Sequence, residues 1–331
     1  MATGPRLPLQ GGLAPVAPAT GEVVEVACDE SGFSGTNLLD PATPVFTHAS
    51  TDLDVTEAAA LVAELRSGSR WSLGELKSAQ FFRSPHAGEA SAWLLAVLAG
   101  RAHVHIVDKE YFLVTRVLDL FLVDPSYAAG TRLSRAEPAA ALAVYRDGRL
   151  RGTAWTGFLA AFVDLVRTKR HRDGDRDRVA RFLAARDALL RAGLTAGATG
   201  VLARLDPQRV RAVVARLSRD DRSIPPPLEP LLPALAETVL HWSAGERQVL
   251  VVHDEQSALT PGRLLRLQAV LAAGGGPSPL AGLVTVDSRD DPRVQVADLL
   301  AGVVRRWPDL DDAALGPYLS ATSLRDGAPR P

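Results

Sequence analysis

The chain contains little sulfur, few aromatic side chains and no long apolar run. Cys28 is the single cysteine among 331 residues, which excludes an intrachain disulfide and a cysteine-based metal site. Aromatic residues make up 5% of the chain, and Trp155 and Phe158 fit a helix core better than a base-stacking platform. No apolar run approaches the length that crosses a membrane. We therefore expect a cytoplasmic protein without a membrane partner.

Motifs of several large enzyme classes are also missing. The chain has no G-x-x-x-x-G-K-[ST] phosphate loop and no H-E-x-x-H zinc motif. It has no G-x-S-x-G nucleophile elbow either. These absences exclude P-loop nucleotide hydrolysis, zincin chemistry and the serine mechanism of α/β-hydrolases.

Charge is nearly balanced over the whole chain but is unevenly distributed. The net charge is −1, yet residues 146–222 contain 18 Lys and Arg against 9 Asp and Glu, which leaves 19 against 29 elsewhere. A basic segment of this kind can bind nucleic acid. A solvated, arginine-biased helical region has the same composition, and such a segment can also bind a protein partner. All of these interpretations stay open.

Apolar periodicity predicts strands and helices at both ends of the chain and helices alone in the middle. We expect strands over 23–29, 44–49, 102–114, 247–256 and 280–288, and the third of them can run into a helix near 114–122. We expect flanking helices over 56–68, 89–100, 260–273 and 290–307, the first capped by Thr56 with Glu57 in its first turn. The alternation predicts an α/β fold with an inserted all-helical region. The expected organisation is a flexible tail over 1–22, a core in two parts over 23–130 and 246–315, a helical insertion over 131–245, and a tail over 316–331.

Three acidic residues lie in unusually apolar surroundings. Asp29 and Asp254 each end a valine-rich strand, and Asp298 lies within an apolar helix. Because side chains alternate along a strand, Asp29 shares a face with Ala27, and Glu30 points the other way. An unpaired charge in such a place is costly.

A divalent cation would explain the three carboxylates together. Mg²⁺ and Mn²⁺ take oxygen ligands, and two such ions about 3.5–4 Å apart can clamp a phosphodiester during hydrolysis. The alternative is that the strand-end acids are merely solvated and that Asp298 pairs with a nearby arginine, of which Arg293, Arg305 and Arg306 are the candidates.

The same residues carry a resemblance to a known family. The segment DESG at 29–32, Glu75-Leu76-Lys77 after the first helix, and Ser288 followed by QVADLLAG at 295–302 resemble the bacterial family catalogued as domain of unknown function 3800. That family belongs to the ribonuclease-H-like superfamily, and the resemblance covers about 23–125 and 246–307. It implies a mixed five-stranded sheet flanked by helices with acidic residues at its centre. It implies no settled activity.

The resemblance also implies roles for particular residues. The acids that would act in catalysis are Asp29, Glu30, Asp254, Glu255 and Asp298. Of these, Asp29, Asp254 and Asp298 would bind the metal. The residue that supplies a fourth carboxylate is one of Glu30, Glu75, Asp287 and Asp290. Lys77, Gln295 and Ser31 would contact substrate. His253 is either a substrate contact or, more commonly for its position, a structural histidine.

Together these observations predict a nuclease that depends on Mg²⁺ or Mn²⁺ and hydrolyses DNA or RNA at a two-metal carboxylate site. The alternative is a catalytically silent ribonuclease-H-like module that binds nucleic acid or protein, in a defence or mobile-element system. Hydrolysis of a small phosphorylated molecule is a third possibility.

Overall fold

A computed structural model describes residues 12–15, 21–33, 35–67, 78–131, 138–167, 175–273, 276–306 and 315–326. The described residues form two compact units. The first, here called the sheet unit, takes its residues from 1–33, 46–106 and 234–323. The second, here called the helical unit, takes its residues from 34–45, 107–233 and 324–331. Each unit is described by itself.

A mixed, open sheet of six strands lies at the centre of the sheet unit, which makes the fold α/β. The strands are β1 (Gly12–Leu13), β2 (Val23–Ser31), β3 (Val45–Thr51), β4 (Ala102–Asp108), β5 (Gln248–Asp254) and β6 (Leu280–Val286). Their order is β1-β6-β5-β2-β3-β4. Strands β2, β5 and β6 run parallel, whereas β3 is antiparallel to β2 and β1 is antiparallel to β6.

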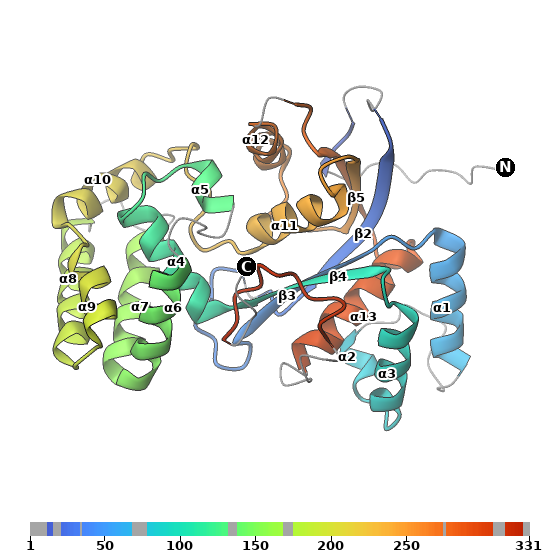
Figure 1. Ribbon diagram of the computed structural model, residues 1–331, viewed down its shortest axis with the longest axis horizontal. Coiled ribbons are helices and arrows are strands. Elements are labelled where there is room, and N and C mark those ends of the chain that lie inside the picture. Colours follow the sequence, from blue (N-terminus) through green and yellow to red (C-terminus); the bar gives the residue numbers. More distant parts are fainter. Residues whose placement is uncertain are drawn as a thin grey trace. The chain divides into compact units, whose positions relative to one another are not determined.

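Helices cover both faces of this sheet. They are α1 (Val55–Ser67), α2 (Ser78–Phe81), α3 (Ala87–Val97), α11 (Leu231–Ser243), α12 (Pro261–Leu271) and α13 (Pro292–Arg306). Figure 1 shows α11 and α12 on one side, and α13 with α1, α2 and α3 on the other. Because both faces of the sheet are covered, the central strands consist of nearly continuous apolar residues. In β2, Val26, Ala27 and Cys28 are all fully buried.

Helix α13 packs directly on the strands that end in Asp29 and Asp254. Its Val294 forms a buried cluster with Ala27 of β2 and Val252 of β5. The hydroxyl of Thr47 in β3 donates to the carbonyl oxygen of Ala301 at 2.9 Å. These contacts fix the helix that carries Asp298 against the strands.

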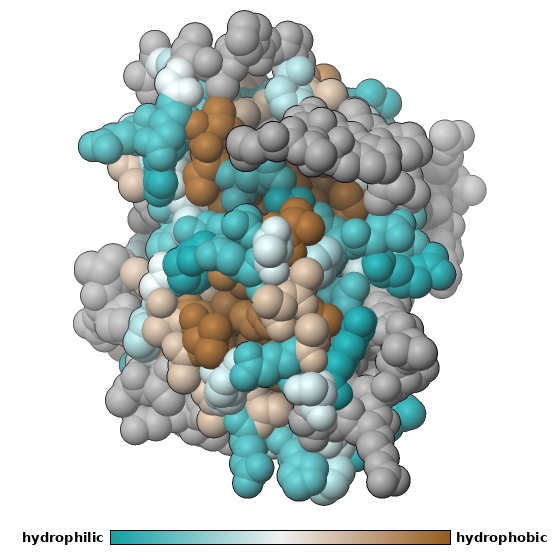
Figure 2. Space-filling view, turned by 90° about the vertical axis from the view of Figure 1, so that its right-hand side faces the viewer, coloured by the Kyte–Doolittle hydropathy of each residue, from teal (hydrophilic) through white to brown (hydrophobic). Residues whose placement is uncertain are grey.

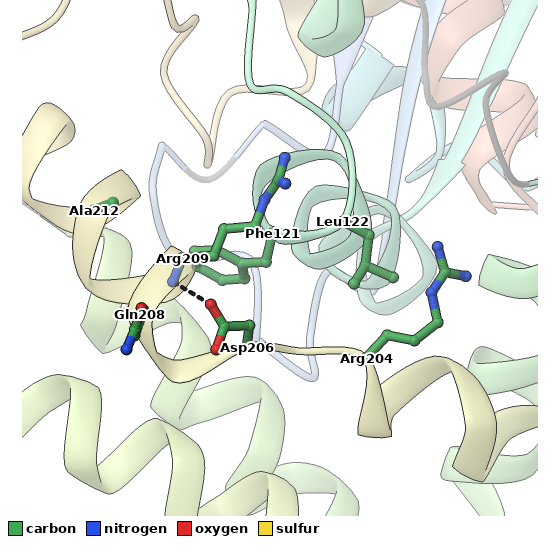
Figure 3. A pocket seen from close by; sticks show the side chains of 7 residues that line it. All are labelled: Phe121, Leu122, Arg204, Asp206, Gln208, Arg209 and Ala212. Atoms are coloured by element: carbon green, nitrogen blue, oxygen red, sulfur yellow. Dashed lines mark hydrogen bonds between the residues drawn. The ribbon is translucent and has the colours of Figure 1, made fainter.

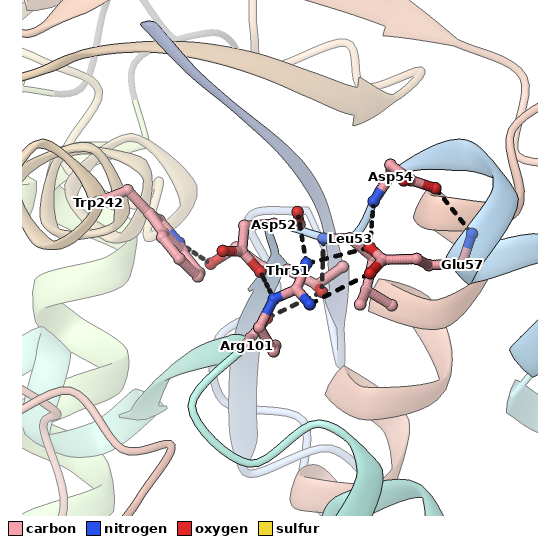
Figure 4. A network of polar contacts seen from close by, with 8 residues as sticks. Thr51, Asp52, Leu53, Asp54, Glu57, Arg101 and Trp242 are labelled. Atoms are coloured by element: carbon pink, nitrogen blue, oxygen red, sulfur yellow. Dashed lines mark hydrogen bonds and ion pairs between the residues drawn. The ribbon is translucent and has the colours of Figure 1, made fainter. Parts of the chain in front are cut away.

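The start of α1 differs from the expected one. The helix begins at Val55, so Thr56 lies inside it and the predicted cap at Thr56 is wrong. The backbone N–H of Glu57 donates to Asp54 at 2.8 Å, and the carboxylate of Glu57 accepts from the backbone N–H of Asp54 at 2.9 Å. This reciprocal arrangement is a capping box. Arg101 ties it to the sheet by pairing with Glu57 at 3.1 Å and with Asp52 at 2.6 Å (Figure 4).

The helical unit is built from helices packed around aromatic side chains. Its helices are α4 (Lys109–Phe121), α5 (Tyr127–Thr131), α6 (Pro138–Gly148), η1 (Arg149–Arg151), α7 (Thr153–Val166), α8 (Asp175–Arg191), α9 (Ala196–Ala203) and α10 (Pro207–Ser218). Phe121, Phe158, Phe162 and Phe182 are fully buried in contact with one another.

The helical unit begins before the predicted insertion of 131–245. Residues 109–114 were expected to continue a strand, but they belong to helix α4. Asp108 ends β4 and caps α4 by accepting from the backbone N–H of Tyr111 at 3.0 Å. This hydrogen bond satisfies a backbone N–H that has no partner within the helix, so the helix can begin at Lys109.

Short pairings also occur within the two predicted tails. Gly12 and Leu13 pair with Val284 and Leu283 along the outer edge of β6. Near the other end, Leu319 forms a bridge with Val104 of β4. Among the helices of the described ranges, none has the length and apolar character needed to cross a membrane.

Candidate functional site

Asp29, Asp254 and Asp298 come to one face of the sheet. Ala27 pairs with Val252 across β2 and β5, and each aspartate lies two residues further along its strand. The two-residue period of a strand therefore turns both aspartates to the face of Ala27, which α13 covers. Asp298 projects from α13 towards the same place, since its charge acts on Asp29. The three carboxylates that the sequence singled out thus gather at the ends of β2 and β5.

The environment of Asp29 disfavours its charge. The side chain is 5% exposed. Burial raises the pKa of Asp29 well above its usual value, and the charges of Glu30, Asp298 and Asp254 raise this pKa further. The backbone N–H of Glu30 donates to Asp29 Oδ1 at 2.7 Å and lowers the pKa in part. Carboxylates held together in this way favour either protonation or a cation.

Glu30 lies on the opposite face of β2, beside two histidines. It pairs with His48 across β2 and β3, and its Oε2 lies 3.8 Å from Nε2 of His253. Gln256 donates to Oε1 at 2.6 Å, whereas Oε2 is buried without a hydrogen-bond partner among the described residues. Burial raises the pKa of Glu30, His253 and Gln256 lower it, and Asp254 and Asp298 raise it. Glu30 therefore interacts electrostatically with Asp254 and Asp298, although its side chain lies on the opposite face of the strand.

Asp298 is held by a short helix that is distant in sequence. Ser78 of α2 donates its backbone N–H to Oδ2 at 2.8 Å and its hydroxyl to Oδ1 at 2.9 Å. The close approach depends on Gly302, one turn after Asp298. A Cβ at Gly302 would lie 2.7 Å from Cβ of Ser78. The glycine of the QVADLLAG segment thus makes room for the residue that orients its aspartate.

Asp254 and Gln295 are joined through the loop after β6. The backbone N–H of Ser288 donates to Asp254 Oδ1 at 3.2 Å, and the amide of Gln295 donates to the carbonyl oxygen of Ser288 at 2.8 Å. Arg66 donates to the amide oxygen of Gln295 at 3.3 Å. Gln295 is 5% exposed, so it holds this loop and lies one step removed from the carboxylates.

The remaining predicted residues are placed as follows. The side chain of Glu255 is exposed beyond the end of β5, so it does not share the burial of the acids described above. Asp290 is exposed, and Asp287 forms an ion pair with Arg289. Glu75 and Lys77 lie outside the described residues. Of the four candidates for the fourth carboxylate, Glu30 is the one whose charge acts on Asp29 most strongly.

Two arginines lie at the end of α13, and the sequence indicated both, with Arg293, as candidate partners of Asp298. Arg305 donates through Nε to the hydroxyl oxygen of Ser31 at 2.8 Å, and the charge of Asp298 acts on it. The guanidinium of Arg306 lies 4.4 Å from the ring centroid of Phe82. Arg305 follows Asp298 by two helical turns, a spacing that places both on one face of α13.

Two hollows of the described surface lie away from the carboxylates. One, with a volume of about 620 Å³, lies in the helical unit (Figure 3). Its lining residues are Phe121, Leu122, Arg204, Asp206, Gln208, Arg209 and Ala212. The other, of about 380 Å³, includes Leu65 and Trp93 and opens on the face that carries α1 and α3, where apolar patches lie among hydrophilic side chains (Figure 2). Neither lining contains a predicted site residue, so we place the candidate site at the carboxylates.

The carboxylates are close enough to interact but are not preassembled around an ion. Among the described residues, no three His, Cys, Asp or Glu side chains are arranged to hold a metal ion as they lie. The donor set itself is suited to a hard cation, because it consists of carboxylate oxygens, among them Oε2 of Glu30, which accepts no hydrogen bond from the described residues.

Comparisons with known proteins add no relative. No protein-family model matches the chain, and neither a curated protein nor a solved structure matches it.

Proposed function

We propose that the protein is a divalent-metal-dependent phosphodiesterase that cleaves nucleic acid, built on a ribonuclease-H-like core. The observation that carries this proposal is the convergence of Asp29, Asp254 and Asp298, from two strands and one helix, on one face of the sheet. Their mutual charge raises the pKa of the buried Asp29. A site that assembles like charges in a buried place is a candidate for catalysis or cation binding.

A cation would resolve the electrostatic conflict among these side chains. Asp29, Asp254 and Asp298 would hold Mg²⁺ or Mn²⁺. Glu30, whose Oε2 accepts no hydrogen bond from the described residues, would complete the ligand set. Terminal carboxylate torsions are broad, so small rotations would bring the oxygens from their present positions onto an ion. The bound ions would supply Lewis-acid stabilisation of the phosphate and activate water for attack on phosphorus. The chain would contribute orientation, through Ser78 on Asp298 and Ser288 on Asp254.

The architecture supports the same proposal. Strands β2 to β6 form a mixed five-stranded arrangement to which the two-residue β1 is added, and the acids lie on its central strands β2 and β5. This agrees with what the resemblance to the uncharacterised ribonuclease-H-like family implies.

The surroundings of the carboxylates suit a polyanionic substrate. Arg305 lies beside Ser31 and near Asp298, where it would contact a phosphate next to the one being cleaved. Phe82, already stacked with Arg306, offers an aromatic surface to a base. Residues 146–222, with twice as many basic as acidic residues, would add backbone contacts that weaken with salt.

The experiment is cleavage of end-labelled single- and double-stranded DNA and RNA with Mg²⁺, Mn²⁺ or EDTA. We expect cleavage with metal and none with EDTA. Asp29→Asn and Asp298→Asn should each lower the rate by at least about 100-fold, because each removes a ligand charge. Glu89→Gln is the matched control, since the Glu89 side chain is 90% exposed. Cleavage in EDTA, or full activity in both aspartate variants, would refute the proposal.

A second candidate is a module that binds nucleic acid or protein without cleaving it. The observation in its favour is that no three potential ligands are preassembled around an ion among the described residues. Such a module would bind nucleic acid equally well in Mg²⁺ and in EDTA, and it would leave every substrate intact. The same set of reactions, run beside a binding titration, separates the two functions.

A further inference from the structure

The hollow in the helical unit, of about 620 Å³, brings two arginines together beside an apolar floor. Phe121 and Leu122, at the end of α4, supply the apolar part, and Arg204 and Arg209 line it from the ends of α9 and α10 that face each other across a short turn. Figure 3 shows both arginine side chains extending to the same side of that turn, with Leu122 between them in this view. Phe121 also belongs to the buried aromatic core, so the floor is fixed.

The guanidinium group of Arg209 has no acceptor among the described residues. Its Nε is buried without a hydrogen-bond partner, and no ion pair joins the rest of the group to a carboxylate of the described ranges. The backbone N–H of Arg209 donates to Oδ2 of Asp206 at 2.8 Å, a contact that caps α10 and does not involve the side chain. Arg209 is therefore a cation held beside the hollow without a partner of its own in this part of the chain.

Other arginines of the helical unit do have such partners. Where Nε is buried and unpaired, a terminal nitrogen still donates, as in Arg151 to Asp147 at 2.5 Å and Arg167 to the carbonyl oxygen of Thr36 at 2.9 Å. Three further ion pairs join Arg181 to Asp164, Arg186 to Asp187 and Arg216 to Asp221. Those arginines stabilise the unit, whereas no contact among the described residues gives the Arg209 side chain a structural role.

The charge around the hollow favours an anion. The described residues that line it include two guanidinium groups and one carboxylate, that of Asp206. They lie within residues 146–222 or pack beside them, and this segment contains twice as many basic as acidic residues. A guanidinium group binds two phosphate oxygens through parallel hydrogen bonds. A basic surplus along a whole segment strengthens the binding of a polyanion, and nucleic acid offers both the phosphate and the repeated charge.

We propose that this hollow binds a phosphate group of a nucleic-acid strand, with Arg209 as the main contact and Arg204 and Gln208 beside it. The inference rests on the proposed function for the identity of the strand. It adds a binding site that lies in the helical unit and contains none of the carboxylates. Asp206 acts in the opposite direction, because its charge repels the phosphate while its side chain caps α10.

Fluorescence anisotropy of the full chain with a labelled single-stranded oligonucleotide in EDTA tests this site. Arg209→Gln should make the dependence of log affinity on log salt shallower by about 0.7, which corresponds to a roughly eightfold loss of affinity at about 50 mM salt. Arg209→Lys keeps the charge but not the planar fork of donors, so it should keep the salt dependence and lose less affinity. Asp206→Asn should bind more tightly than the wild-type chain, because asparagine also caps a helix and carries no charge.

Arg266→Gln is the matched control, because it removes the same charge from α12, outside both the hollow and the basic segment. Its salt dependence should equal that of the wild-type chain. The unfolding temperature of Arg209→Gln should also equal that of the wild-type chain, since the side chain gives up no contact with the described residues. Equal salt dependence in Arg209→Gln and Arg266→Gln, or no gain of affinity in Asp206→Asn, overturns the inference.

A second polyanion distinguishes nucleic acid from an acidic protein. Polyglutamate should compete poorly with the oligonucleotide, and its affinity should change little in Arg209→Gln, because a carboxylate lacks the third oxygen and the regular spacing of a phosphate backbone. Polyglutamate that binds as tightly as the oligonucleotide, and that Arg209→Gln weakens equally, contradicts the assignment to phosphate.

Cleavage kinetics separate this inference from the proposed function. With Mg²⁺, Arg209→Gln should raise KM and leave kcat unchanged, since the contact is the same in the bound substrate and in the transition state. An active enzyme whose KM does not depend on Arg209 overturns the phosphate site alone. A chain that binds through Arg209 and cleaves nothing supports the phosphate site and refutes the phosphodiesterase. Absence of nucleic-acid binding by the wild-type chain overturns both.

Discussion

Asp29 and Glu30 are adjacent in β2, yet they face opposite sides of the sheet. Asp29 shares its face with Ala27 and the helix that carries Asp298, whereas Glu30 pairs with His48 beneath α11. The charge of Glu30 still raises the pKa of Asp29, because both side chains lie where the strand ends. The end of β2 thus places one carboxyl group, that of Asp29 or Glu30, on each face of the sheet.

Replacing Asp29 should stabilise the metal-free protein at neutral pH. The pKa of Asp29 is raised in the folded state, so the folded chain keeps this proton to a higher pH than the unfolded chain does. Stability from this group is present below the unfolded pKa of about 3.9 and is lost as pH rises through the folded pKa. At pH 7, Asp29→Asn should therefore raise the melting temperature by about 3 °C or more.

The measurement is a pair of thermal scans in EDTA. The advantage of Asp29→Asn should disappear near pH 4, where Asp29 is protonated in the folded wild-type chain. Adding Mn²⁺ at pH 7 should stabilise the wild-type chain far more than the variant. An equal melting temperature difference at both pH values would contradict the assigned electrostatics.

Enlarging Gly302 should impair the site without touching a carboxylate. A Cβ there would lie 2.7 Å from the Cβ of Ser78, so Gly302→Ala should push α2 away and remove both hydrogen bonds to Asp298. We expect cleavage to fall by about 10–100-fold. Gly88→Ala is the matched control, because it also adds a methyl group to a helix but meets no atom within 4 Å. Equal rates for the two variants would contradict the role given to Ser78.

Arg305 should govern binding of nucleic acid more than binding of metal. Arg305→Ala removes a cation beside Ser31, so the dependence of log affinity on log salt should become shallower by about one unit. Fluorescence anisotropy with a labelled oligonucleotide in EDTA measures this slope. Mn²⁺ affinity should fall no further than about twofold. An unchanged dependence of affinity on salt would show that Arg305 does not contact the nucleic acid.

The sequence predicted those parts of the fold that follow from local periodicity. The strands and flanking helices lie close to their predicted ranges, and the two-residue period correctly set Asp29 apart from Glu30. The start of α4 was predicted a few residues too late because the alternating pattern continues past residue 108, whereas the cap at Asp108 begins the helix at Lys109.

The sequence could predict only those features of the candidate site that follow from the alternation of side chains along a strand. The partners of its side chains come from distant segments. Ser78 and Asp298 are 220 residues apart, and Glu30 meets Gln256 across 226 residues. Local patterning carries no information about such pairs, because they depend on the register of the sheet and the approach of α2 to α13. The contact between Thr238 and His48, 190 residues apart, could not be predicted from the sequence for the same reason.

The most direct test of the central claim is anomalous diffraction from crystals grown with Mn²⁺. We predict a manganese peak bounded by carboxylate oxygens of Asp29, Asp254 and Asp298 at roughly 2.2 Å, with Glu30 Oε2 turned towards it. A structure with Mn²⁺ in the solution and no manganese between these three carboxyl groups would contradict the account.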